Sequence, residues 1–228
     1  MLSINYLPLN ALLDRDFLEQ YIYPNMFANY YWSDDFSAKY YIAQAKAGFI
    51  AVTEAYKNKE LLIPEIQFNY ALLDFKDLHI SKKVKRLLKK EKLELTIDEN
   101  LDEVFNGINN QHSSWLTSKY LQTLKDTKGI DKDFKVVSAY IKKDNIVVAG
   151  EIGYFIGKTY TSLSGFSLRK KEYNNYGKAQ LVLLAKYLQL NNFAFWNLGH
   201  PHMPYKLALG AKIYTRAEFL KRWYKERE

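Results

Sequence analysis

The sequence has no cysteine among its 228 residues, and this absence narrows the chemistry open to it. Without a thiol there is no disulfide, no thiolate ligand for zinc and no cysteine nucleophile. Histidine is scarce too, with four in all, and the His200/His202 pair has no convergent acid near it in the sequence. We therefore expect neither a bound metal nor a cofactor.

The sequence also lacks the segments that direct a chain into or across a membrane. No window approaches the roughly 20 apolar residues that a membrane-spanning helix needs. Residues 1–13 are mildly apolar, but Asn5, Pro8 and Asn10 interrupt them and no basic start precedes them. We expect a cytoplasmic protein without a membrane partner, and take a monomer as the working expectation.

What the sequence does contain is enough apolar material for a core, together with a surplus of positive charge. Apolar residues make up 48% and charged residues 25%, which excludes a disordered or collagen-like chain. Lys and Arg total 33 against 25 Asp and Glu, for a formal charge of +8. Such a surplus favours an anionic partner, and nucleic acid is the first candidate.

A shift in composition near residues 74–77 divides the chain. We expect a small N-terminal α/β domain at residues 1–75 and a larger domain at residues 76–228. In the first part, Ser33 and Gly48 are the predicted caps of a helix. The elements predicted there are a helix at 34–47 and strands at 49–53, 61–63 and 71–75.

The larger part begins with a basic helix that Ser81 caps, and then becomes a sheet with attached helices. The predicted elements are helix 81–92, strand 93–97, helices 100–111 and 117–127, strands 134–141, 146–156 and 160–166, helix 178–191, strand 193–198 and a helix after Thr215, whose capping box uses Glu218. This part therefore contains, in order, three antiparallel strands, a long helix, a strand and a final helix. That order is expected of an N-acetyltransferase-like (GNAT-like) domain. The predicted fold class is α+β or α/β, with a mixed, largely antiparallel sheet flanked by helices.

Short motifs in a shared order carry a resemblance to a known family. They are Ala45-Lys-Ala-Gly-Phe-Ile50, Asp77-Leu-His-Ile-Ser81 with the basic run after it, Ser114-Trp-Leu-Thr117, Asn145 to Gly153, Gly165-Phe-Ser167, Leu209-Gly-Ala211 and Thr215-Arg-Ala-Glu-Phe-Leu220. Together they resemble the leucyl/phenylalanyl-tRNA–protein transferase family over roughly residues 40 to 222.

The resemblance implies an enzyme that forms a peptide bond without a ribosome. It would take an aminoacyl group from a charged tRNA and place it on the N-terminal α-amine of a protein, marking that protein for degradation. The partners are then aminoacyl-tRNA and a protein or peptide N-terminus. Since the donor is an activated ester, the chemistry needs alignment, a base for the attacking ammonium and stabilisation of an oxyanion.

The basic helix is the first candidate for tRNA binding. Its candidate residues are Lys82, Lys83, Lys85, Arg86 and Lys89. At 3.6 residues per turn several of these cations share one face, which suits a phosphate backbone. A solvated surface helix explains the charge pattern equally well, and the resemblance favours tRNA.

Trp115 is the second candidate, because the resemblance implies that this ring stacks on the terminal adenosine of the donor. A loop aromatic that merely fills the core is the alternative. Lys178 and Lys206 complete the tRNA-binding set, and Lys206 either contacts the donor phosphate or packs. We expect one continuous positive surface to join Arg86 to Trp115.

The donor amino-acid pocket departs from the family pattern, in which methionines line it. Glu151 and Gly165 stand at methionine positions, and Leu163 stands where the family carries an acid near the substrate's amino group. A buried carboxylate needs a cationic partner. That partner is either the side chain of a transferred Arg or Lys, or the α-ammonium of the donor. If the strand register is shifted by one residue, Glu151 faces solvent instead.

The catalytic strand departs as well. Asn197 stands for the family's Asp and Gly199 for its Gln, so the inherited proton relay is in doubt. Asn197 can orient a group or stabilise an oxyanion, but it is no base. His200 and His202 follow directly and are the candidates for the missing base.

Two other functions stay open. Asn174-Asn-Tyr-Gly-Lys-Ala179 sits where an acyl-CoA-dependent N-acetyltransferase binds pyrophosphate, and only its first residue fails that pattern. A non-catalytic tRNA-binding module is the third possibility, since both relay groups are replaced.

Overall fold

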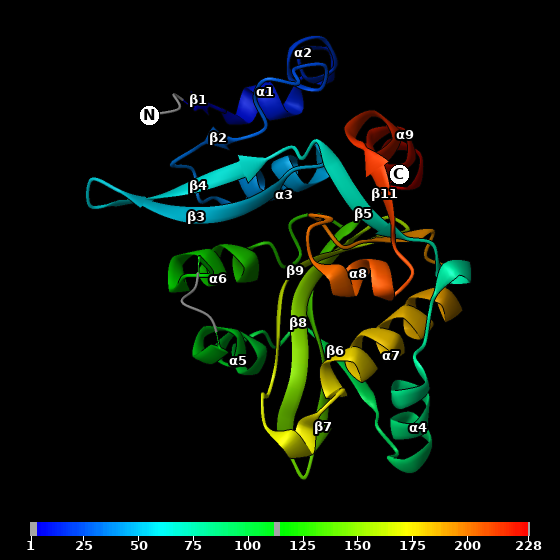
Figure 1. The fold of residues 1–228 in the computed structure, drawn as a ribbon. Coiled ribbons are helices and arrows are strands. Elements are labelled where there is room, and N and C mark those ends of the chain that lie inside the picture. Colours follow the sequence, from blue (N-terminus) through cyan, green and yellow to red (C-terminus); the bar gives the residue numbers. More distant parts are fainter. Residues whose placement is uncertain (1–3, 112–114, 228) are drawn as a thin grey trace.

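A computed structural model describes residues 4–111 and 115–227 of the chain. The first part, to the left and top of Figure 1, is built from short elements around two small sheets. Its elements are β1 (Asn5–Tyr6), α1 (Leu9–Leu13), α2 (Arg15–Phe17), β2 (Tyr31–Trp32), α3 (Ala38–Lys46), β3 (Ile50–Tyr56) and β4 (Lys59–Glu65). β1 and β2 pair in parallel, and β3 and β4 form an antiparallel hairpin.

The predicted helix at 34–47 is present as α3, but its predicted N-cap is wrong. Ser37 caps the helix, because its side chain accepts a hydrogen bond from the Tyr40 amide. Ser33 instead forms a β-bridge with Leu62. The predicted end is confirmed, since Gly48 follows the helix with a φ of +87°.

The second part is a seven-stranded sheet with the strand order β11-β5-β10-β9-β8-β7-β6. The strands are β5 (Asn69–Leu73), β6 (Leu95–Asp98), β7 (Phe134–Lys143), β8 (Ile146–Ile156), β9 (Thr159–Ser167), β10 (Phe195–Asn197) and β11 (Lys212–Thr215). β7, β8 and β9 form the predicted antiparallel meander. Asp144 and Asn145 make the first turn, with φ of +50° and +64°.

Helices cover both faces of this sheet. They are α4 (Lys82–Lys90), α5 (Asp102–Gln111), α6 (Ser118–Asp126), α7 (Tyr176–Leu190), α8 (Pro204–Ala208) and α9 (Arg216–Glu226). Alternate residues of β7 pack on opposite sides: Val136 joins the cluster that contains Val104 of α5, and Val137 joins the cluster that contains Val182 of α7. In Figure 1, α5 and α6 lie on one side of β8, and α7 and α4 on the other. The α+β architecture with a largely antiparallel, helix-flanked sheet is therefore confirmed.

The two parts share both sheet and core. β5, which precedes residue 75, pairs with β10 and β11 in the seven-stranded sheet. Phe219 and Trp223 of α9 pack in the same cluster as Tyr40 and Phe49 of the first part. The division at residue 75 stays a prediction. Among the described residues, no helix is long and apolar enough to cross a membrane.

One buried arginine ties the parts together. Arg216 is 2% exposed, and its guanidinium donates to the carbonyls of Gln67 at 3.1 Å, Ile66 at 2.7 Å and Tyr23 at 3.2 Å. A planar fork with several donors suits this arrangement of carbonyls. The contacts fix the β4–β5 connection next to the end of β4.

Candidate active site

A cleft opens in the seven-stranded sheet where β10 leaves β9. The two strands are paired in parallel from Phe195↔Thr159 to Asn197↔Thr161, and beyond that point β9 continues beside β8 alone. The cleft has a volume of about 600 Å³ and lies between β8 and β9, the start of α7, the chain from Leu198 to Lys206, and Trp115. Six predicted site residues line it: Trp115, Glu151, Leu163, Gly165, Lys178 and Lys206.

Glu151 lies in the wall of the cleft and is 4% exposed, so it does not face solvent. Its Oε1 accepts hydrogen bonds from Ser162 Oγ at 2.6 Å and from Tyr160 Oη at 3.0 Å. Burial raises the pKa of the Glu151 carboxyl to about 7, although both hydroxyls and the charge of Lys206 act to lower it. Near neutral pH the group can therefore carry a proton or release it.

Lys206 is buried, not a surface cation, and only 5% of it is exposed. Its ammonium donates to the Leu198 carbonyl and, at 2.7 Å, to the His200 carbonyl. Burial lowers the pKa of Lys206 to about 8, and the charge of Glu151 opposes that effect. Lys206 thus holds the loop after β10 and supplies a positive charge to the cleft. Lys206 was expected either to contact the donor phosphate or to pack, and these contacts correspond to packing.

Trp115 is half-buried and lines the cleft. Ser113 and Ser114, which precede it in the sequence, lie outside the described residues. Thr53 of β3 donates a hydrogen bond to its carbonyl, and its ring meets Tyr120 edge to face at 5.4 Å. The indole is therefore fixed by its neighbours while it lines the cleft.

Asn197, the predicted replacement of a catalytic Asp, is not among the residues that line the cleft, and neither are the predicted bases His200 and His202. Asn197 is 1% exposed, and its Oδ1 accepts a hydrogen bond from the Gly199 amide at 2.9 Å. Its side chain holds the turn after β10. The catalytic role expected of Asn197 stays a prediction.

The two histidines after β10 stack on each other, with ring centroids 5.4 Å apart. His202 is exposed, whereas His200 is bound through Nε2 to Glu65 Oε2 at 2.8 Å. Glu65 belongs to β4 and is 6% exposed. Sequence reasoning missed Glu65, since 135 positions separate it from His200 and no local motif marks it.

The basic helix α4 lies away from the cleft. Val84 anchors it in the cluster with α7, and the candidate cations Lys82, Lys83, Lys85, Arg86 and Lys89 are exposed. None of these five forms an ion pair with an acidic residue in the described part of the chain. Figure 1 places α4 beyond α7, and α5 and α6, which flank Trp115, across the sheet. Because α4 packs on α7, Arg86 is carried by a helix on the α7 side of the sheet, and the continuous positive surface expected between Arg86 and Trp115 stays a prediction.

Another basic surface adjoins the cleft. A depression of about 400 Å³ is lined by Arg169, Lys170, Lys171 and Lys178, and it shares Ser167, Gly177 and Lys178 with the cleft. The run Arg169-Lys-Lys171 is visible in the sequence, but only the fold brings it to the start of α7.

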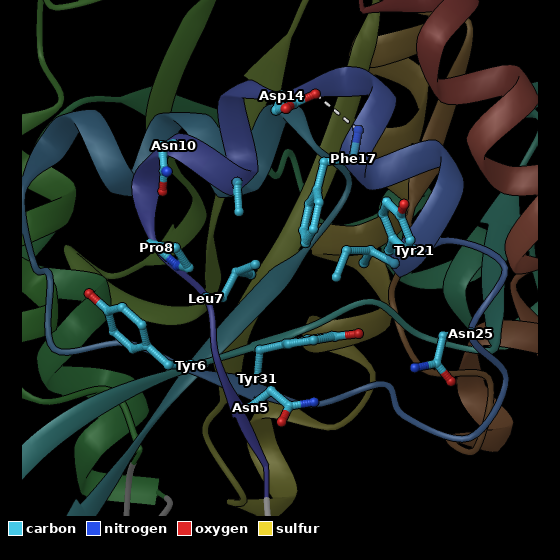
Figure 2. A pocket seen from close by; sticks show the side chains of 12 residues that line it. Asn5, Tyr6, Leu7, Pro8, Asn10, Asp14, Phe17, Tyr21, Asn25 and Tyr31 are labelled. Carbon is cyan, nitrogen blue, oxygen red and sulfur yellow. Dashed lines mark hydrogen bonds between the residues drawn. The ribbon is translucent and has the colours of Figure 1, made fainter.

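A further cavity, of about 560 Å³, lies under the N-terminal segment and contains none of the predicted site residues. Figure 2 shows Tyr6, Leu7, Phe17 and Tyr31 around it. The Tyr31 hydroxyl is buried and has no hydrogen-bond partner among the described residues. This cavity is separate from the cleft in the sheet.

Comparisons with known proteins show which proteins the chain is similar to. The family model described as leucyl/phenylalanyl-tRNA protein transferase matches residues 72–224. A leucyl/phenylalanyl-tRNA–protein transferase of Paracoccus denitrificans is 24% identical over 148 residues, which are 64% of this chain and 65% of the relative. One of Flavobacterium johnsoniae is 25% identical over 158 residues, 65% of this chain and 69% of the relative. The chain thus spans about two thirds of the length of the curated relatives it matches.

One solved structure has a similar fold. The crystal structure of FemX is 12% identical, with a TM-score of 0.51 over 91% of this chain and 74% of that one. At this identity the likeness concerns the fold alone, and it confirms the predicted GNAT-like architecture.

Proposed function

The chain belongs to the leucyl/phenylalanyl-tRNA–protein transferase family, and on this basis we propose that it transfers an amino acid from a charged tRNA to the N-terminal α-amine of a protein. The observation that carries the proposal is the cleft in the sheet, which has a fixed indole at one wall and a buried carboxyl at another. The transferred residue would mark the acceptor protein for degradation.

Trp115 is the proposed seat for the terminal adenosine of the donor. The ring is half-buried and held in place by Tyr120 and by the hydrogen bond from Thr53, so little freedom is lost when a base stacks on it. Stacking of a base on an aromatic side chain contributes about 1–3 kcal/mol. Seating the adenosine here aligns the ester with the rest of the cleft.

The donor amino acid is proposed to lie between Trp115 and Glu151, beside Leu163 and Gly165. Lys206 already places a positive charge near Glu151, which weakens the argument for an Arg or Lys donor. We therefore favour an uncharged donor, Leu or Phe, whose α-ammonium meets Glu151. That ammonium favours the ionised carboxylate, and a pKa of about 7 makes the ionisation inexpensive.

The tRNA body is proposed to follow the basic residues nearest to the cleft. Arg169, Lys170 and Lys171 continue from Lys178 along the depression before α7. The exposed cations of α4 lie beyond α7 and are open to a more distant part of the tRNA backbone. Both surfaces predict binding that weakens steeply with salt.

The proposal is tested by an assay of aminoacyl transfer from tRNA to a peptide. The protein is incubated with tRNA charged in turn with labelled Leu, Phe, Arg or Lys, and with peptides that begin with Arg, Lys, Asp or Glu. Label on the peptide from Leu or Phe supports the proposal in full, and label only from Arg or Lys assigns Glu151 to the donor side chain. Binding of tRNA without label on any peptide supports the non-catalytic module.

A further inference from the structure

Glu65 sits at the end of β4, outside residues 72–224 that match the family, yet its carboxylate reaches a residue beside the cleft. Oε2 lies 2.8 Å from His200 Nε2, and Asn29 Nδ2 donates to Oε1 at 2.7 Å. A carboxylate that accepts from Nε2–H fixes the imidazole tautomer and leaves the Nδ1 lone pair available. Among the described residues, Nδ1 has no hydrogen-bond partner.

We propose that Glu65 is a positioning residue that orients His200 as the general base for the acceptor α-ammonium. The inference rests on the proposed function and adds to it the group that removes the proton. Asn197 cannot do so, because an amide has no basic nitrogen and its side chain is engaged in its own turn.

The β3–β4 hairpin connects His200 to Trp115 in the wall of the cleft. Thr53 of β3 donates to the Trp115 carbonyl, and Glu65 of β4 binds His200. Ile50 is paired with Glu65, and Thr53 follows three residues later, so the two anchor points are about 10 Å apart along the hairpin at ~3.4 Å per residue. One rigid element thus holds the wall that seats the adenosine and the loop that carries the base.

The loop that carries His200 is fixed from its other side. Lys206 binds the carbonyls of Leu198 and His200, and Leu198 and Lys206 both line the cleft. The ionisable groups that face His200 are therefore Glu65, the stacked His202 and the Lys206 ammonium at its carbonyl. Arg216 holds the Ile66 and Gln67 carbonyls directly after Glu65, which limits the movement of that carboxylate.

The proposed step balances in protons and bonds. His200 Nδ1 takes one proton from the acceptor α-ammonium, and the freed amine lone pair attacks the ester carbonyl carbon of the donor. A C–N bond forms and the ester C–O bond breaks. The imidazolium returns its proton to the departing ribose oxygen, and the second amine proton leaves to solvent.

The experiment is a double-mutant cycle in the transfer assay with leucyl-tRNA and an arginine-initiated peptide. His200→Ala is expected to lower kcat about 10²–10⁴-fold, with the KM for tRNA unchanged. Glu65→Gln is expected to lower kcat at least about 10-fold in the wild-type background. In the His200→Ala background it should lower kcat no further, because Glu65 acts through the imidazole.

Two controls keep the result interpretable. Glu54→Gln, an exposed acid on the same hairpin, should leave kcat unchanged. Added imidazole should restore part of the rate of His200→Ala, which shows that this variant is folded. An equal loss from Glu65→Gln in both backgrounds, or no loss in either, overturns the inference while transfer by the wild type stands. Absence of transfer by the wild type refutes the proposed function itself.

Discussion

Ser162 Oγ lies 2.6 Å from Glu151 Oε1 and 2.8 Å from Trp196 Nε1. The indole N–H donates to the serine oxygen, and the serine O–H donates to the carboxyl. A buried strand residue of β10 thereby fixes the hydroxyl that serves Glu151 in the cleft. This chain of donors explains how an acidic side chain is held in the interior of the sheet.

Glu151 should make the protein less stable as pH rises. Its pKa is raised from 4.5 to about 7, so between these values the folded state holds a proton that the unfolded state releases. Stability from this group is therefore full below pH 4.5 and is lost as pH rises through 7. This difference in pKa corresponds to a loss of up to about 3 kcal/mol in the free energy of unfolding.

Glu151→Gln tests whether Glu151 lowers the stability of the protein as pH rises. Relative to the wild type, the variant should gain stability between pH 5 and pH 8, by less than the full amount because ionised Glu151 also favours charged Lys206. Urea denaturation at the two pH values measures the difference. A wild-type advantage that grows with pH contradicts the account.

Trp115→Ala should weaken the binding of aminoacyl-tRNA by about 5- to 150-fold, which corresponds to the loss of ~1–3 kcal/mol of stacking. Trp115→Phe keeps an aromatic face and should lose less. Equilibrium binding at fixed salt measures both variants, and their melting temperatures show whether the packing against Tyr120 matters for stability. Equal binding by all three proteins removes the indole from the tRNA site.

The two basic surfaces can be separated by the salt dependence of tRNA binding. Charge reversal at Arg169, Lys170 and Lys171 should reduce the slope of log K against log salt by about 0.7–0.9 for each tRNA phosphate that these side chains neutralise. The same change at Lys82, Lys85 and Arg86 tests α4, and reversal at exposed Lys221 of α9 is the matched control. If neither basic set changes the slope while binding persists, both assignments are wrong.

Arg216→Lys should destabilise the protein by about 2–4 kcal/mol, because a lysine cannot serve the Gln67, Ile66 and Tyr23 carbonyls together. Urea denaturation measures the loss, with Arg222→Lys, in the half-buried pair with Asp74, as comparison. Arg216→Lys should lower the free energy of unfolding more than Arg222→Lys does. The reverse order contradicts its role as the link between the two parts.

Local signals in the sequence predicted most of the fold. Ser81 and Thr215 cap their helices as expected, because a cap depends on residues within one turn. The same reasoning wrongly placed the cap of α3 at Ser33, because the β-bridge between Ser33 and Leu62 is a tertiary contact that local signals do not reveal.

The candidate site was predictable in its strand residues and less so in its loops. Glu151 reaches the cleft because strand alternation fixes which face a residue occupies. Glu65 and His200 meet through a contact across 135 positions, and the packing of α4 on α7 is equally non-local. Burial of Lys206 also lacks a signal in the sequence, because it depends on two carbonyls that the turn after β10 presents.

The central claim is that the cleft joins an amino acid from tRNA to an N-terminal α-amine. Its most direct test is mass spectrometry of an acceptor peptide after incubation with leucyl-tRNA, phenylalanyl-tRNA and acetyl-CoA together. We predict a mass gain of one leucine or phenylalanine residue at the peptide N-terminus. A gain of one acetyl group, or an unchanged peptide after the tRNA has been bound, contradicts the claim.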